Sequence, residues 1–178
     1  MKISRLLLDG LFLIETEPFV DHRGKFGRLF CSRELGDAGL HMDIVQINQS
    51  LTRQKGAVRG MHFQHSPHAE IKVVRCLRGG CFDVAVDMRP DSPTYLQWHG
   101  ELLTADNGRA MFIDKGFAHG FQTVEPNTEL LYFHSDFYKP SAEGGVKHDD
   151  PVLGIDWPLP ICDVSDRDMN FSLLSQTG

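Results

Sequence analysis

Residues 71–87 read IKVVRCLRGGCFDVAVD and give the clearest indication of how this chain folds. Two apolar runs, residues 71–77 and 81–87, flank Arg78-Gly79-Gly80, a pattern that predicts a β-hairpin. Along the second run, alternation places every other side chain on the same face of a strand. One face would carry Phe82, Val84 and Val86, and the other Cys81, Asp83, Ala85 and Asp87. Asp83 would then either partner a buried cation or lie on the surface.

Apolar runs separated by glycine and proline continue on both sides of this stretch. Further strands are predicted at residues 1–20 (one or two strands), 44–50, 94–103, 109–113, 120–124 and 130–137. Turn signals recur every ~8–12 residues, as in antiparallel sandwiches and barrels. A short helix is expected at residues 32–39 with Ser32 as its N-cap. The sequence thus predicts an all-β fold of the jelly-roll type with a few short helices, forming a single domain over residues 1–178.

Composition and charge exclude several classes of protein. The formal net charge of −6 argues against nucleic acid as the main partner, because phosphate binding needs a basic surface. No apolar run approaches the ~20 residues that span a bilayer, and the apolar segment at the start is too short for a secretory signal. We expect the cysteines to be buried free thiols of a cytoplasmic protein, since they form no C-x-x-C pair: Cys31, Cys76, Cys81 and Cys162.

Titratable residues concentrate in the stretch RGMHFQHSPHAEIK, residues 59–72. This density beside apolar segments indicates a functional site, although a polar loop between strands would have a similar composition. The histidines only loosely resemble the metal motifs of cupin barrels. His62 and His65 lie three residues apart and so point to opposite faces of a strand, which Pro67 then ends. The spacing therefore predicts no metal site.

A second chemistry for this region needs no metal. Lys72 shares the parity of Val74 and Cys76 on an apolar strand, and Tyr132 lies on another predicted strand. A base such as His62, a cation and a phenol around one cavity suit proton abstraction next to a carbonyl group. The lysine and the tyrosine also have ordinary structural alternatives, a surface lysine that reaches solvent and a core tyrosine with its hydroxyl at the rim.

Spacing leaves two further positions open. Strict alternation sends Arg59 to the face opposite His62, unless Gly60 marks a bulge that re-aims one of them. Asp168 ends the sequence SDRD, residues 165–168, which has the pattern of a capping box at the start of a short helix. From these residues alone we expect a structural, helix-capping role for Asp168.

Several longer motifs occur in order along the chain. They are DHRG at 21–24, VRGMHFQ at 58–64, KVVR at 72–75, FDVAVD at 82–87, SPT at 92–94, GFAHGF at 116–121, LY at 131–132 and IDWP at 155–158. With them the chain resembles the nucleotide-sugar 3,5-epimerases typified by dTDP-4-dehydrorhamnose 3,5-epimerase, from Asp21 to Asp168. The resemblance implies a cupin-like jelly roll without a cofactor. It also implies inversion of C3 and C5 in a nucleoside-diphospho-4-keto-6-deoxyhexose by way of an enolate.

The resemblance implies catalytic roles for four residues. His62 would be the base, held and made more basic by Asp168, a role that replaces the capping role or is combined with it. Tyr132 would return a proton to the opposite face of the sugar. Lys72 would lie near the ketone oxygen and stabilise the enolate, an electrostatic effect that often dominates catalysis.

Substrate contacts and a partner are implied in the same way. Ligand contacts are implied for Arg59 and His119, at the diphosphate or sugar, and for Arg23, Gln46, Glu143 and Arg167. Family members are homodimers that exchange N-terminal strands, so Arg23 would reach the neighbour's site.

Two departures from the family pattern fall at the nucleotide end of the site. Arg28 stands where the family commonly has a glutamate that contacts the nucleotide, and Ile47 where aspartate is frequent. The preferred nucleotide therefore stays open, as does the choice between one inverted centre and two. An alternative from another class is a non-catalytic sugar-binding jelly roll.

Overall fold

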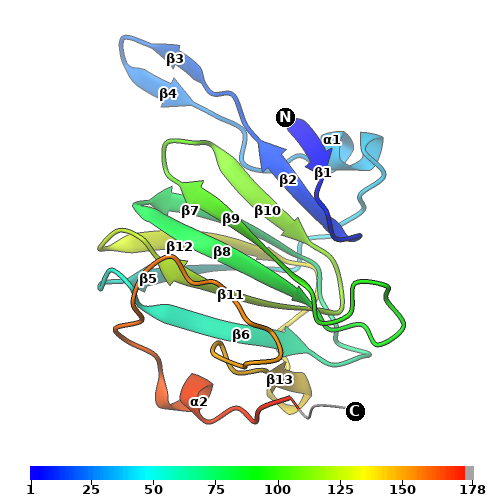
Figure 1. The fold of residues 1–178 in the computed structure, drawn as a ribbon. Coiled ribbons are helices and arrows are strands. Elements are labelled where there is room, and N and C mark those ends of the chain that lie inside the picture. Colours follow the sequence, from blue (N-terminus) through cyan, green and yellow to red (C-terminus); the bar gives the residue numbers. More distant parts are fainter. Residues whose placement is uncertain (175–178) are drawn as a thin grey trace.

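Two antiparallel β-sheets form the body of the protein in the computed structural model, which describes residues 1–174 (Figure 1). The six-stranded sheet has the order β1 (Lys2–Arg5), β2 (Leu11–Glu15), β10 (Arg109–Ile113), β7 (Lys72–Arg78), β12 (Thr128–His134) and β5 (Gln46–Thr52). The five-stranded sheet has the order β13 (Glu143–Gly145), β6 (Val58–Gln64), β11 (Phe117–Thr123), β8 (Gly80–Asp87) and β9 (Trp98–Thr104). Apolar side chains of both sheets share one core cluster, so the predicted all-β jelly roll is confirmed.

A two-stranded hairpin and short helices complete the fold. The hairpin of β3 (Phe19–Asp21) and β4 (Gly24–Phe26) extends away from both sheets (Figure 1). The helices are α1 (Ser32–Asp37), the 3₁₀ turn η1 (Pro140–Ala142) and α2 (Asp166–Met169). The prediction that Ser32 caps the first helix is wrong, because Cys31 is the N-cap and makes no side-chain capping bond. That helix is held by packing of its buried Leu35.

Strands β7 and β8 do not form the hairpin that the sequence predicts. β7 pairs with β10 and β12 in one sheet, whereas β8 pairs with β9 and β11 in the other. Gly79, with φ of +69°, turns the chain at the corner between the sheets, and the N–H of Gly80 bonds Oγ1 of Thr128 there. Most side chains of both strands are buried. An apolar run of this kind cannot distinguish a hairpin from a corner.

Several strand boundaries also differ from the predictions. The strand predicted at residues 94–103 begins only at Trp98, because the hydroxyls of Ser92 and Thr94 donate to Asp87 and hold the preceding residues in a turn. Strand β5 is displaced towards the C-terminus relative to residues 44–50, and β12 ends at His134 rather than at 137.

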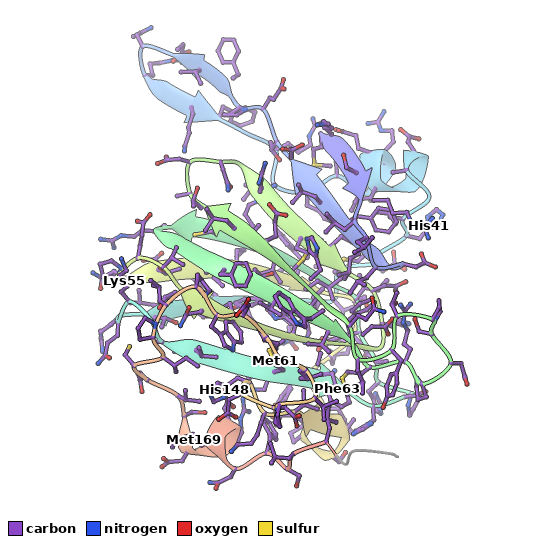
Figure 2. All side chains as sticks on the ribbon, in the orientation of Figure 1. His41, Lys55, Met61, Phe63, His148 and Met169 are labelled. Carbon is purple, nitrogen blue, oxygen red and sulfur yellow. The ribbon has the colours of Figure 1, made fainter. Side chains whose placement is uncertain are left out.

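The alternation predicted for residues 81–87 is confirmed. Cys81 and Ala85 pack in the core between the sheets, whereas Val84 and Val86 pack in a layer on the outer face. Met61 of β6, labelled in Figure 2, belongs to this outer layer. The chain after β13 covers it with apolar side chains that include Leu153, Ile155 and Trp157.

All four cysteines are free, but only two of them are buried. Burial raises the pKa of Cys76 to about 11 and that of Cys81 well above its ordinary value, so both stay neutral thiols at neutral pH. Cys31 is partly exposed and Cys162 is exposed, which corrects the prediction of burial for these two. Within residues 1–174 no helix has the length and apolar character required to cross a membrane.

Candidate active site

A cavity of about 700 Å³ lies at one end of the space between the sheets. Strands β5, β6, β7, β11 and β12 line it together with residues 163–168. Alternation brings polar side chains to its wall, since Lys72 follows the parity of buried Val74, and Tyr132 that of buried Leu130. Lys72 is only 8% exposed, which rules out a surface lysine. Along β7 and along β12, the side chains that face the space between the sheets therefore change from apolar to ionisable.

His62 on β6 contacts Asp168 on α2 across the cavity wall. Nε2 of His62 lies 2.8 Å from Oδ1 of Asp168, whose Oδ2 accepts the N–H of Gly60 at 3.0 Å. Burial alone would raise the pKa of Asp168, but the hydrogen bonds with His62 and Gly60 outweigh it and hold the pKa far below its ordinary value. Asp168 is therefore a carboxylate at neutral pH and stabilises positive charge on the imidazole.

The capping role expected for Asp168 is half right. Oγ of Ser165 accepts the backbone N–H of Asp168 at 3.2 Å, so Ser165 does cap α2. The reciprocal half of a capping box would turn the side chain of Asp168 back to the N-cap, but its carboxylate is engaged by Gly60 and His62 instead. The helix cap thus orients a carboxylate towards the cavity.

A bulge at Gly60 brings Arg59 and His62 to the same cavity. Gly60 has φ of +127°, and the pairing of β6 with β11 shifts register beside it. A Cβ at Gly60 would lie 2.6 Å from Cα of Gly120, so the close approach of the strands requires glycine. Arg59 is anchored by a bond from its Nε to Oγ1 of Thr52 at 2.9 Å. Of the two alternatives for Arg59, the bulge is confirmed.

Arg167 adds a third group to the His62–Asp168 pair. Its Nη2 lies 2.7 Å from Nε2 of His62, and its Nε lies 3.2 Å from Oδ1 of Asp168. Its Nη1 donates to Oε1 of Glu143 at 2.9 Å, and the other oxygen of Glu143 accepts the hydroxyl of Tyr138 at 3.2 Å. Glu143 therefore contacts the cavity through Arg167.

His119, in the cavity wall, forms a second pair with Asp83, which is buried behind it. Nε2 of His119 lies 2.8 Å from Oδ1 of Asp83, and the two residues are 6% and 0% exposed. Of the two alternatives for Asp83, the surface position is therefore wrong, because its side chain is buried against the imidazole of His119. Oδ1 of Asp83 is hydrogen-bonded to His119, whereas its Oδ2 is buried with no hydrogen-bond partner among the residues that the structure describes.

Tyr132 and Lys72 complete the set of groups that can exchange protons or stabilise charge. The Tyr132 hydroxyl lies 3.0 Å from Oγ of Ser50, and burial raises the pKa of Tyr132 far above its ordinary value. It is therefore a protonated phenol at neutral pH and can donate a proton. Nζ of Lys72 lies 3.4 Å from the backbone oxygen of His62 and 3.4 Å from Oε1 of Glu70.

Besides Glu143, three of the expected ligand contacts do not line this cavity: Arg23, Arg28 and Gln46. Arg23 is at the turn of the β3–β4 hairpin, where its Nη2 lies 2.6 Å from Asp21, and Arg28 pairs with Glu34 near α1. Gln46 donates to Oδ1 of Asn48, a cavity residue, at 3.2 Å. Arg23 and Arg28 therefore sit outside the cavity of their own chain.

The structure also places in the wall residues that were not predicted from the sequence. Ser50 and Asn48 on β5 are brought to Tyr132 and His134 by strand pairing. His134 follows Tyr132 by two residues, so strict alternation is the one signal that pointed to it. Among residues 1–174, no group of three or more His, Cys, Asp or Glu side chains is placed to hold a metal ion.

Comparison with known proteins identifies the family. Residues 5–176 match the family model for dTDP-4-dehydrorhamnose 3,5-epimerase. The enzyme of that name from Methanothermobacter thermautotrophicus is 40% identical, over 98% of this chain and 95% of its own. A crystal structure of the enzyme of that name from Bacillus anthracis str. Ames, with TDP and PPi bound, has a TM-score of 0.94 and 38% identity, over 97% of this chain and 99% of that one.

A relative that is named for a different activity is almost as similar. The dTDP-4-dehydrorhamnose 3-epimerase of Streptomyces niveus is 37% identical, over 99% of this chain and 85% of its own. Both names describe epimerases, and an epimerase is an isomerase. The predicted resemblance is confirmed over nearly the whole chain: this protein belongs to the dTDP-4-dehydrorhamnose 3,5-epimerase family.

Proposed function

We propose that this chain inverts C3 and C5 of a nucleoside-diphospho-4-keto-6-deoxyhexose, converting dTDP-4-dehydro-6-deoxyglucose to dTDP-4-dehydrorhamnose without a cofactor. One observation carries the proposal. A histidine paired with a carboxylate, a protonated phenol and a buried lysine line one cavity: His62 with Asp168, Tyr132 and Lys72. A base, an acid and a cation are the three groups that epimerisation next to a ketone needs.

The proposed mechanism proceeds through an enolate. The C4 ketone acidifies the hydrogens on C3 and C5, and the free nitrogen of His62 removes one of them. Asp168 stabilises the imidazolium that forms, as the carboxylate does in other histidine–carboxylate pairs. The ammonium group of Lys72 stabilises the negative charge on the enolate oxygen. Tyr132 then returns a proton to the opposite face of the carbon, which inverts it.

Arg59, His119 and Arg167 are proposed to bind the diphosphate and the sugar. The guanidinium groups of the two arginines suit two-pronged contacts with phosphate oxygens, and all three residues line the cavity. The TDP bound to the related Bacillus anthracis enzyme supports a nucleoside diphosphate as the ligand. Gln46 and Glu143 are proposed to support the ligand from the rim, through Asn48 and Arg167.

A second copy of the chain is the proposed partner. The β3–β4 hairpin extends from the body of the protein, and its apolar side chains Phe19, Val20 and Phe26 are 67%, 68% and 81% exposed. Exposed apolar surface of this kind marks an interaction site. We propose that the chain, one cytoplasmic domain over residues 1–178, forms a homodimer by exchanging these strands. The exchanged hairpin then brings Arg23, and with it Arg28, to the neighbour's cavity.

A mono-epimerase that inverts C3 alone is the second candidate. It is favoured by the similarity to the Streptomyces niveus 3-epimerase, which extends over 99% of this chain. The groups named above would serve one inversion as well as two.

The test is incorporation of solvent deuterium into dTDP-4-keto-6-deoxyglucose, followed by NMR at C3 and C5 separately. Label with inversion at both positions supports the double epimerase, and label with inversion at one position supports the mono-epimerase. No label at either position would contradict both for this nucleotide, and CDP and GDP sugars would then test whether Arg28 has changed the nucleotide preference.

A further inference from the structure

Three histidines of the cavity wall each have a carboxylate partner. The proposals above give a role to the histidine of two pairs, His62 and His119, and none to His134. In the third pair, Nδ1 of His134 lies 2.8 Å from Oε2 of Glu70, as close as in the other two. The His134 and Glu70 side chains are only 10% and 9% exposed. Burying a carboxylate is costly unless it is paired, so packing alone does not explain this pair.

Strand register brings the third pair to Lys72. His134 and Lys72 lie opposite each other in the ladder between β12 and β7, and Glu70 precedes β7 by two residues. Nζ of Lys72 lies 3.4 Å from Oε1 of Glu70 and 3.4 Å from the backbone oxygen of His62. Both distances exceed the ~2.7–2.9 Å of a strong charge-assisted hydrogen bond. The ammonium group therefore has a counter-charge without being tightly bound by it.

Glu70 carries its negative charge at neutral pH. Burial alone would raise the pKa of Glu70, but the hydrogen bond with His134 and the charge of Lys72 outweigh burial and lower it. A carboxylate only accepts hydrogen bonds, so Nδ1 of His134 is the donor. In the neutral ring Nε2 then accepts from Nδ2 of Asn48 at 3.3 Å, and Oδ1 of Asn48 accepts from Gln46. The charge on Glu70 thus identifies Nδ1 of His134 as the donor in this pair.

We propose that Glu70 and His134 are positioning residues for Lys72. Glu70 supplies the counter-charge that keeps the ammonium group in a buried wall. His134 holds the carboxylate by its other oxygen, so that Glu70 does not close on Lys72 and the ammonium group stays within reach of the enolate oxygen. Without His134, both oxygens of Glu70 are available to Lys72, and a tight ion pair draws the ammonium group away from the ligand. This inference rests on the proposed function, in which Lys72 stabilises the enolate.

Two substitutions at one position separate positioning from packing. His134→Leu removes the donor to Glu70, whereas His134→Asn keeps a donor, because its amide nitrogen lies about where Nδ1 of the imidazole lies. We expect kcat for deuterium exchange to fall roughly 10–100-fold in His134→Leu, less than for outright loss of a stabilising donor, with KM and dTDP affinity within about twofold. His134→Asn recovers most of that loss. Equal kcat in the two variants, or a change confined to KM, would overturn the proposal.

Crystal structures of the same variants give a readout that does not depend on activity. In His134→Leu the distance from Nζ of Lys72 to the nearer oxygen of Glu70 should shorten from 3.4 Å to hydrogen-bond length, and in His134→Asn it should stay. An unchanged distance in His134→Leu would refute the positioning role even if the enzyme is an epimerase. Absence of deuterium exchange in the unsubstituted protein would instead refute the proposed function, while the distances would still decide the role of His134.

Discussion

Nη2 of Arg167 lies 2.7 Å from Nε2 of His62, the same nitrogen that lies 2.8 Å from Oδ1 of Asp168. A neutral imidazole nitrogen either donates or accepts in the plane of its ring, so the two contacts require different tautomers. Donation from Arg167 leaves the proton on Nδ1. Donation to Asp168 leaves Nδ1 free to act as a base. In the proposed reaction, a phosphate that draws Arg167 away would therefore leave His62 in the basic tautomer.

Asp168→Asn should inactivate the base while leaving the fold intact. The asparagine oxygen can still accept the N–H of Gly60, but its amide N–H can donate to Nε2 of His62 and fix the wrong tautomer. We expect kcat for exchange to fall about 10²–10⁴-fold, the usual contribution of general acid–base catalysis. Exchange kinetics by NMR measure this, with dTDP affinity by calorimetry as the control. A fall of less than about threefold would show that Asp168 does not activate His62.

Arg167→Met should act on binding instead. Loss of a charged hydrogen-bond donor to phosphate costs about 1.5–3 kcal/mol, which corresponds to a KM roughly 10–100-fold higher. The kcat at saturation should stay within about threefold, because Asp168 then has no competitor for Nε2 of His62. Arg78→Met, at an arginine that does not line the cavity, is the matched control. A lower kcat at unchanged KM would mean that Arg167 takes part in the chemical step.

Tyr132→Phe should uncouple proton loss from inversion. Burial keeps the Tyr132 phenol protonated, so its removal deletes the proposed proton donor and leaves His62 in place. We expect completed inversion to slow by about 10²–10⁴-fold, while wash-out of the substrate α-deuterium slows much less. Both rates come from one NMR time course. Equal slowing of the two rates would contradict a role for Tyr132 as the acid. Ser50→Ala, which removes the contact to the hydroxyl, is a milder control.

Mixing two inactive variants tests whether the hairpin acts in the neighbouring copy. Arg23→Ala and His62→Ala each damage every site in their own homodimers. In mixed dimers, the intact His62 of one copy receives the intact Arg23 of the other. After unfolding and refolding together, about a quarter of all sites should recover activity. If no activity is recovered in material that light scattering shows to be dimeric, Arg23 does not act in the cavity of the neighbouring copy.

Asp87 should make stability depend on pH in the acid range. It is fully buried and accepts bonds from Arg89, Ser92 and Thr94. Burial alone would raise the pKa of Asp87, but these bonds lower it from 3.8 to about 2. The stabilisation is therefore complete above the unfolded pKa and is lost as the pH falls towards about 2. At about 1.4 kcal/mol per pKa unit, it amounts to about 2 kcal/mol.

Urea unfolding of the protein and of Asp87→Asn, between pH 6 and the acid limit of folding, measures this effect. The difference in the free energy of unfolding should shrink by about 2 kcal/mol as the pH falls. A difference independent of pH would mean that the Asp87 charge contributes nothing to stability.

Local pattern was enough to predict most of the strands, although not β13 or the β3–β4 hairpin, and the face that Lys72 shares with Val74. Alternation with Val74 depends only on neighbours in sequence, and the two residues do face the same side. The hairpin at residues 78–80 was wrong because the pairing of β7 and β8 with other strands is decided by distant segments. His134 could not be predicted for the same reason, because it is brought to Lys72 only by the pairing of β12 with β7.

Long-range contacts decided the rest of the site. His62 and Asp168 are 106 residues apart, so no spacing rule could join them, and only the resemblance to known epimerases did. The position of Arg59 depended on the bulge at Gly60, which alternation allowed but did not require. Arg23 and Arg28 lie outside the cavity of their own chain, and a sequence does not say which copy a side chain serves.

The helix that carries Asp168 has a consequence for how the protein is made. It is the last helix of the described chain, and it follows all thirteen strands in sequence. During synthesis both sheets, with His62, Tyr132 and Lys72, therefore leave the ribosome before Asp168, the carboxylate that pairs with His62. The strands that line the cavity can therefore assemble in the nascent chain before His62 has its carboxylate partner.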